Sequence, residues 1–353
     1  MLDGWMLEYK NEFITEDIRY NPKCPCLGTC PNHGFCKACL KWHSHPPHNN
    51  HRPTCQREAD WYLKMPPLNI PLQKIKDLPV GARVRDAKNQ MVWLIAAHNH
   101  PGYTGTTLVA EHLVGAGSFD AKEPENPKSG NWDNVKEYGN NYYPYSNIRQ
   151  WLNSAQANWY SPQHRYDAPP ANDNIKYRDC PYDEKPGFLA DFSPTFLKGL
   201  QEVEVKCIKK GAEGKAEPDT IRDKVFLLSR TEIGSGDESG LAEGSKLPLF
   251  NEYVYLLARP TTEDIRKYQT VWLPGIPLTK TIQDISSGWW YWLRSPMLKY
   301  EYLARVMING AHSYSLAYND RVGIRPALNL DSELMLSDTL DENGIYTLTD
   351  GER

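Results

Sequence analysis

Short apolar runs separated by long polar stretches make up most of the chain beyond residue 70. Four runs have the length and the β-favouring residues of buried strands: Met91–Ala97, Lys224–Leu228, Tyr253–Leu257 and Trp289–Leu293. Two further stretches, 304–310 and 312–318, meet at Asn309-Gly310, the strongest short signal for a hairpin turn. We therefore expect several short strands, two of them in a hairpin.

Two segments instead space their apolar side chains for a helix. In residues 145–153 the apolar positions fall at i, i+3 and i+4 from Ile148, and residues 192–200 carry a similar stripe from Phe196. Candidate N-caps are Ser146 or Asn147 for the first helix and Ser193 for the second, where a proline follows at the first helical position. Two short helices are therefore predicted.

Polar stretches without periodicity occupy residues 115–145, 155–187 and 209–222, and these are predicted to be loops. Loops longer than about 12–15 residues inside a compact domain are usually functional or disordered. Acidic residues in loops such as 232–243 are expected to be solvated. Two helices and scattered strands among such loops predict an α+β fold rather than a parallel α/β fold.

Composition excludes some classes of protein. The 353 residues are 24% charged and 40% hydrophobic, which is typical of a folded chain. Forty basic against 44 acidic residues give a net charge of −4, so no global field attracts phosphate backbones, and a nucleic-acid partner is not expected. The longest apolar run is far shorter than the ~18 residues that a membrane helix needs, so membrane insertion is not expected either.

The start of the chain carries early acidic residues and lacks the apolar core of a secretory signal. Classical secretion from this start is not expected. The locations left open are a virion or a cell surface reached without a classical signal peptide, and the cytoplasm.

Cysteine and histidine crowd the N-terminal part of the chain. Six of the eight Cys lie between Cys24 and Cys55, and five of the ten His lie between His33 and His51. We predict a Cys/His-rich module over residues 1–64, a proline-rich linker over 65–70 and a larger ligand-binding domain over 71–353.

Thiolates and imidazoles at these spacings are the ligands of tetrahedral zinc, so we predict a structural zinc ion. Its candidate ligands are Cys24, Cys26, Cys30, Cys36, Cys39, His43 and Cys55. Disulfides and an iron–sulfur cluster are the alternatives. The isolated Cys180 and Cys207 are expected to be ordinary thiols.

Two motifs near the C-terminus carry a resemblance. Gly288-Trp-Trp-Tyr-Trp-Leu-Arg-Ser-Pro296 is followed by Gly323-Ile-Arg-Pro-Ala-Leu-Asn-Leu330, and Val92–Gly102, Tyr145–Ser154 and Lys224–Ser229 fit as upstream landmarks. This pattern, over residues 75–348, resembles a bacterial and phage family with a W-W/Y-W-L-R-S-P … G-V/I-R-P-A-L-N-L signature. That family is similar to the C-type-lectin-like fold of formylglycine-generating enzymes and of variable proteins of diversity-generating retroelements.

The resemblance implies a C-type-lectin-like binding protein whose specificity lies between the two motifs, such as a phage receptor-binding protein or adhesin. The Trp-rich strand is expected to be core. Arg294 and Arg325 are expected to form buried hydrogen bonds or ion pairs. Substituting the adenines of an AAC codon never yields Lys299, Glu301, Met297 or Met307, so the fold is better supported than active diversification.

The segment between the motifs has the composition of a binding surface, because Tyr, Ser, Asn and Arg combine rigid aromatic area with adaptable hydrogen bonding. Its candidate ligand-binding residues are Lys299, Tyr300, Glu301, Tyr302, Arg305, Asn309, His312, Ser313, Tyr314, Ser315, Tyr318, Asn319, Asp320 and Arg321. A solvated hairpin face is the alternative. The expected partner is a protein or glycan on a cell surface, with loops 115–145 and 155–187 walling the site; homo-oligomerisation is left open.

Enzymatic functions are weighed against this prediction. The formylglycine-generating chemistry needs paired cysteines near the C-terminus, and no cysteine follows Cys207. His98, His100, Glu111 and His112 could serve a metal-dependent enzyme, although Asn99-His100-Pro101-Gly102 is typical of a simple turn. We therefore expect a non-enzymatic recognition protein. The alternative is an intracellular zinc-module protein with a lectin-like scaffold or sensor.

Overall fold

The structure is a computed structural model, and it describes residues 73–211, 214–238, 240–261, 289–308, 311–337, 340–341 and 343–348. Residues 75–334 form one compact unit. The described residues outside this range belong to a second unit, in which Lys74 pairs with Met335 and Leu336 pairs with Leu348, beside the strand β12 (Ile345–Thr347). The predicted boundaries at residues 64 and 70 lie outside the described residues and stay predictions.

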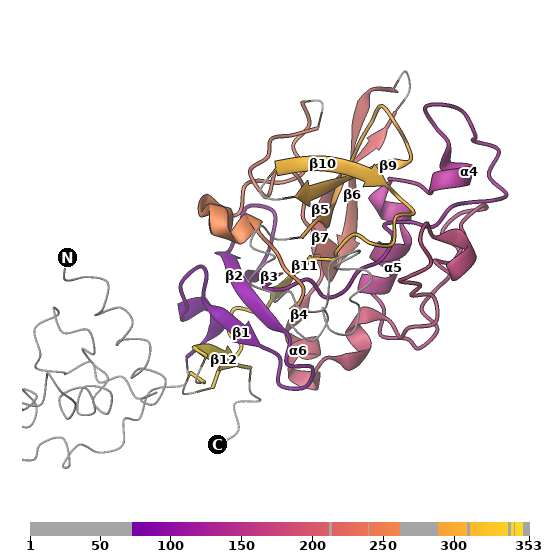
Figure 1. Cartoon of the computed structure of the whole chain (residues 1–353). Coiled ribbons are helices and arrows are strands. Elements are labelled where there is room, and N and C mark those ends of the chain that lie inside the picture. Colours follow the sequence, from indigo (N-terminus) through magenta and orange to yellow (C-terminus); the bar gives the residue numbers. More distant parts are fainter. Residues whose placement is uncertain are drawn as a thin grey trace, which may run out of the picture. The chain divides into compact units, whose positions relative to one another are not determined.

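The larger sheet of the main unit curls into a half-barrel (Figure 1). Its strands in this unit follow the order β1-β2-β3-β11-β4, with β7 also pairing with β11, and every pair is antiparallel. The strands are β1 (Arg83–Arg85), β2 (Val92–His98), β3 (Thr106–Ala110), β4 (Leu200–Gln201), β7 (Val225–Leu227) and β11 (Pro326–Leu330). All residues of β3 and β11 are buried, which makes these strands the centre of the core.

A second antiparallel sheet has the order β10-β9-β8, formed by β8 (Tyr291–Pro296), β9 (Leu303–Ile308) and β10 (Ala311–Leu316). A two-stranded hairpin joins β5 (Val203–Lys210) and β6 (Ala216–Asp223). The predicted pairing of the two stretches around residue 310 is confirmed, because Ala311 is in register with Ile308 and Leu316 with Leu303.

Short helices complete the unit: α4 (Val135–Tyr138), α5 (Asn147–Leu152) and α6 (Pro194–Gly199), with 3₁₀ turns η1 (Ile75–Asp77), η2 (Tyr143–Tyr145), η3 (Asn172–Asn174), η4 (Phe188–Asp191), η6 (Pro248–Asn251) and η7 (Tyr253–Leu256). Both predicted helices are confirmed with their caps. The Ser146 hydroxyl accepts from the Arg149 amide at 3.4 Å, and the Ser193 hydroxyl accepts from the Phe196 amide at 3.2 Å.

Two predictions of local structure were wrong. Residues 253–257 were expected to be a strand, but the backbone there closes i→i+3 hydrogen bonds from Tyr255 to Glu252 and from Leu257 to Val254, so its donors are satisfied without a partner strand. Residues 209–222 were expected to be a loop, yet β6 pairs with β5 along its length. Its residues are exposed or half-buried except for the last, Asp223, and backbone pairing therefore holds a strand that shows no apolar pattern.

Large aromatic side chains fill the core. Trp93 on β2 packs against Phe192 and Phe196, with ring centroids 6.2 Å and 5.9 Å away, and Trp292 on β8 meets Phe119 edge-on at 5.6 Å. Trp93 and Trp292 are both fully buried. The Trp-rich strand is core from Tyr291 to Pro296, whereas Trp290 before it is 38% exposed. The predicted α+β class is confirmed, in a form that consists mostly of strands. None of the helices in the described ranges is long and apolar enough to cross a bilayer.

Candidate functional site

The segment predicted to bind ligand comprises the turn after β8, the β9–β10 hairpin and the return to β11. Its exposed members are Lys299, His312 and Tyr314; its half-buried members are Tyr300, Glu301, Tyr302, Arg305, Ser313, Tyr318 and Arg321; its buried members are Ser315, Asn319 and Asp320. Asn309 lies outside the described residues. The segment therefore divides into an outward part and an internal part.

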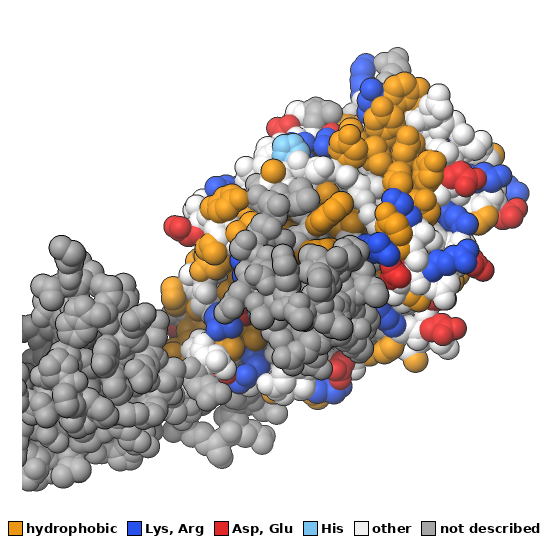
Figure 2. All heavy atoms as spheres, in the orientation of Figure 1, with side chains coloured by type: hydrophobic (Ala, Val, Ile, Leu, Met, Phe, Trp, Pro, Cys, Tyr) orange, Lys and Arg blue, Asp and Glu red, His pale blue; other side chains and the backbone are white. Residues whose placement is uncertain are grey.

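Aromatic side chains from distant parts of the chain meet beside the turn, and we call them the aromatic surface: Trp132, Tyr138, Tyr300, Tyr302 and Tyr318. Trp132 stacks on Tyr300 with centroids 5.1 Å apart and planes at 20°, and Tyr300 lies 5.7 Å from Tyr302. Tyr138 contacts Tyr302 at 5.2 Å and Tyr318 at 5.6 Å. Figure 2 shows hydrophobic side chains gathered at the upper right, over the region where Figure 1 places β9 and α4.

The aromatic surface is accessible and carries a cation. The Trp132 side chain is 51% exposed, which is unusual for so large an apolar group. The Lys299 ammonium lies 4.6 Å from the Trp132 ring centroid and 5.2 Å from that of Tyr300, within the range of cation–π attraction. Sequence reasoning missed Trp132 and Tyr138, whose only signal was their place in the long loop 115–145.

The turn at residues 297–302 is fixed from below by one amide. The Asn141 Nδ2 group donates to the carbonyl oxygens of Met297, Tyr300 and Leu303 at 3.1 Å, 2.8 Å and 2.8 Å. The backbone N–H of Asn141 also donates to the Glu301 carbonyl oxygen at 2.8 Å. Because the acceptors are backbone atoms, these four hydrogen bonds do not depend on which side chains the turn displays.

Glu301 ties the same turn to two lysines. Its carboxylate accepts from the Lys128 ammonium at 2.6 Å, and the Lys210 ammonium lies 3.2 Å away. Burial disfavours ionisation of Glu301, but the two lysines outweigh it, and the net effect is a lowered pKa. Glu301 therefore stays charged and links the turn to loop 115–145 and to the end of β5.

The hairpin face is tied to the loop that follows β7. Arg305 on β9 donates to both oxygens of Glu238 at 2.8–3.1 Å, and Arg230 donates to the same carboxylate at 2.9 Å. His312 on β10 lies 3.4 Å from the Arg230 guanidinium. Burial, followed by the charges of Arg230 and Arg305, lowers the pKa of His312 despite the opposing charge of Glu238.

The internal part of the segment anchors loop 155–187. The Asp320 carboxylate accepts from the backbone amides of Tyr177, Asp179 and Cys180 at 2.8 Å, 2.7 Å and 3.0 Å. Arg321 donates to the Asp179 carboxylate at 2.6 Å and lies over the Tyr177 ring at 4.0 Å. Asn319 donates to the Ser315 hydroxyl at 2.9 Å. These contacts place loop 155–187 against the segment.

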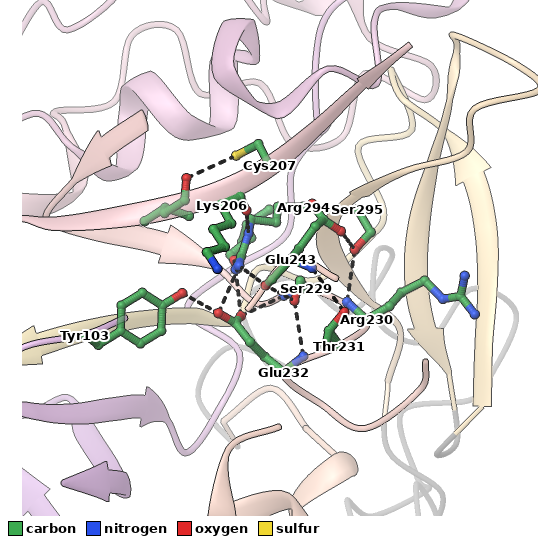
Figure 3. Close-up of polar contacts among 12 residues, drawn as sticks. Tyr103, Lys206, Cys207, Ser229, Arg230, Thr231, Glu232, Glu243, Arg294 and Ser295 are labelled. Carbon is green, nitrogen blue, oxygen red and sulfur yellow. Dashed lines mark hydrogen bonds and ion pairs between the residues drawn. The ribbon is translucent and has the colours of Figure 1, made fainter. Parts of the chain in front are cut away.

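A buried ion pair joins β8 to the loop that follows β7 (Figure 3). Arg294 on β8 donates to both oxygens of Glu232 at 2.6 Å and 2.9 Å, and both side chains are 0% exposed. Arg294 also donates to the carbonyls of Leu227, Lys206 and Glu243 at 2.7–2.9 Å. The expectation that Arg294 forms buried polar contacts is confirmed.

The prediction of solvated acids in residues 232–243 was wrong for three of them. Glu232, Glu238 and Glu243 are 0%, 7% and 1% exposed. The loop folds back over β8 and β9, and Glu232 and Glu238 form ion pairs with the arginines of these strands. Tyr103 donates a hydrogen bond to Glu232, and Ser295 donates one to Glu243. The second carboxylate oxygen of Glu243 is buried without a hydrogen-bond partner.

Arg325, in the second C-terminal motif, is buried as expected. It donates to the carbonyl oxygens of Ala110 at 3.0 Å and Tyr255 at 2.6 Å, and it lies over the Tyr291 ring at 5.4 Å. The two arginines thus fix β8 and the start of β11, which are the two ends of the displayed segment.

The histidines considered for a metal site have protein partners. His98, at the end of β2, contacts the Thr106 hydroxyl at 3.0 Å and the Leu78 carbonyl at 2.8 Å through its two ring nitrogens. His100 contacts the Ser245 carbonyl at 3.0 Å, and the Glu111 carboxylate binds Arg83 at 2.8 Å. Within the part of the chain that the structure describes, no group of three or more His, Cys, Asp or Glu side chains is arranged to hold a metal ion.

The predicted zinc ligands between Cys24 and Cys55 lie outside the described residues, so the zinc site stays a prediction. Cys180 and Cys207 are both buried and unbridged. Burial raises the pKa of Cys180 to about 12, so this thiol stays protonated.

The fold and the site together define a strand-rich α+β protein that displays an aromatic surface beside a hairpin, supported by buried ion pairs. A family model described as Domain of unknown function (DUF6273) matches residues 104–332, and the chain belongs to this family. No curated protein and no solved structure matches the chain.

Proposed function

We propose that this protein is a non-enzymatic recognition protein of C-type-lectin-like architecture that binds a protein or glycan on a cell surface through the aromatic surface. The observation that carries this proposal is the exposed stack of Trp132 on Tyr300, with the Lys299 ammonium beside both rings. Exposed tryptophan and tyrosine are enriched where proteins bind ligands, because they offer large contact area with few rotatable bonds.

The contacts that fix the turn and β8 favour the same function. Asn141, Glu301 and the buried Arg294–Glu232 pair hold the turn and its strand in place, so little conformational entropy is lost when a ligand binds. Tyr314 adds a further exposed aromatic side chain on β10, 51% exposed and opposite Arg305 in register. The proposed binding surface is the aromatic surface together with the exposed residues Lys299, His312 and Tyr314.

Replacing the stack tests the proposal. We expect Trp132→Ala combined with Tyr300→Ala to weaken binding of the full chain to its targets on a glycan array and on bacterial cells by at least about tenfold, because aromatic hot spots carry most of the binding free energy. The melting temperature should change little, since Trp132 is half exposed. Target binding and melting temperature are measured on the same preparations.

Trp290→Ala is the matched control. Trp290 is 38% exposed and lies directly before β8, whereas the turn that carries Tyr300 follows the other end of this strand. Six extended residues span about 20 Å, so Trp290 and the turn lie far apart. Its loss should leave binding unchanged. Binding that survives the double substitution, or falls equally in the control, would place the binding site elsewhere.

A further inference from the structure

A pocket of about 450 Å³ opens beside the aromatic surface. Its walls come from loop 115–145 and η2, from the β5–β6 hairpin and from the turn after β8, which contributes Glu301 to it. The pocket and the aromatic surface therefore share one turn, and a ligand lying on Trp132 and Tyr300 has this pocket within reach.

Positive charge exceeds negative charge on the pocket walls. Lys128, Lys209 and Lys210 line it together with only two carboxylates, Glu301 and Asp219. Lys128 and Lys210 share the single carboxylate of Glu301. Lys209 lies 3.5 Å from Glu217, but both side chains are nearly half exposed, and such pairs contribute little. Glu217 does not line the pocket, so the lining residues carry one more positive than negative charge, and Lys209 can exchange its exposed partner for an anionic ligand.

The remaining wall groups suit a hydroxylated ring. The Tyr142 hydroxyl donates to Asp219, and Tyr145 meets Tyr142 edge-on at 5.0 Å and 90°. Tyr145 is 45% exposed, so part of its ring is open to a ligand. Carboxylate oxygens of Asp219 and Glu301 accept hydrogen bonds, while the lysines donate them, and a sugar hydroxyl does both.

The size of the pocket excludes a bare ion as a good fit. A water-sized group occupies about 30 Å³, whereas pockets of about 300–1,000 Å³ hold small organic ligands. Lining by charged and amide side chains favours a polar ligand over an apolar one.

We infer that this pocket binds an acidic sugar unit of a glycan, with its carboxylate or sulfate group against the lysines and its ring against Tyr145. This inference rests on the proposed function, because it identifies the ligand of the aromatic surface as an acidic glycan. Neutral sugars and acidic peptides are the competing occupants, and both are included in the experiment.

Saturation-transfer NMR on the full chain tests the pocket with four probes: glucuronate, glucose, sodium sulfate as a competitor, and triglutamate. We expect glucuronate to bind. Glucose should bind at least about tenfold more weakly, because it has no carboxylate to accept charge-assisted hydrogen bonds from the lysines. Lys209→Gln should weaken glucuronate about tenfold, and Lys209→Arg should restore most of the affinity. Lys206→Gln is the control, because Lys206 is an exposed residue of β5, like Lys209, but does not line the pocket.

The other outcomes overturn the inference in distinguishable ways. Equal binding of glucose shows a neutral-sugar pocket, sulfate that displaces glucuronate at equal concentration shows a simple anion site, and triglutamate binding without glucuronate shows a peptide site. If no probe binds while target binding still depends on Trp132 and Tyr300, the pocket inference fails and the proposed function stands. If that dependence is also absent, both fail.

Discussion

Glu232→Gln is expected to lower the free energy of unfolding by about 3 kcal/mol or more. The substitution leaves the Arg294 guanidinium, which is fully buried, without its bidentate carboxylate, and breaking one side of a buried ion pair typically costs about 3–5 kcal/mol. The Tyr103 hydroxyl and the Ser229 amide, which donate to the same carboxylate, lose their charged acceptor too. Urea denaturation at pH 7, followed by tryptophan fluorescence, measures the change.

Glu202→Gln is the matched control for this loss. Glu202 binds Arg222 at 2.7 Å on the surface, where the two side chains are 47% and 63% exposed. Exposed pairs contribute about 0–1 kcal/mol, so the control should differ little from the wild type. Equal effects of the two substitutions would show that the buried pair does not stabilise β8.

The second large effect concerns pH and Glu243. Burial raises the pKa of this carboxyl from 4.5 to about 7, although the Arg294 charge and the Ser295 hydrogen bond oppose the rise. The folded protein therefore holds this proton more tightly than the unfolded chain between pH 4.5 and 7. The contribution to stability is fully present below pH 4.5 and is lost as the pH rises through 7.

Glu243→Gln removes this titration and keeps the shape of the side chain. We expect the unfolding free energy of the variant, minus that of the wild type, to increase by about 2–3 kcal/mol between pH 5 and pH 8. Subtraction removes the contributions of other titrating carboxyls, such as Asp223, whose pKa burial raises to about 6 against the effect of Arg149. Glu204→Gln, on an exposed position of β5, controls for the loss of one carboxylate. A difference that is flat with pH would contradict the expectation.

Local signals made much of the fold predictable. Ser146 and Ser193 mark helix starts that the structure confirms, because a cap acts on the amides two or three residues away. The apolar runs that became β2, β7 and β8 are signals of burial, and these strands are buried along most or all of their length. β6 gave no such signal, since its pairing with β5 depends on backbone hydrogen bonds.

The site was predictable only in part, because its partners are far apart in the chain. The composition of residues 297–321 indicated a displayed surface, and the two C-terminal motifs indicated that Arg294 and Arg325 are buried. Nothing local showed that Trp132 stacks on Tyr300, or that Glu232 is the partner of Arg294. Such contacts form when loops pack, and loop packing has no periodic signature.

Asp320 has a consequence for how this surface can evolve. Its carboxylate holds loop 155–187 by the backbone amides of residues 177, 179 and 180, which every amino acid except proline provides. Tyr177 is exposed and Asp179 is half-buried, whereas Cys180 is buried, so mutations at the first two positions can change the side chains that the loop presents without removing these backbone hydrogen bonds. A single acid beside the displayed hairpin thus allows its neighbours to diverge between lineages that meet different targets.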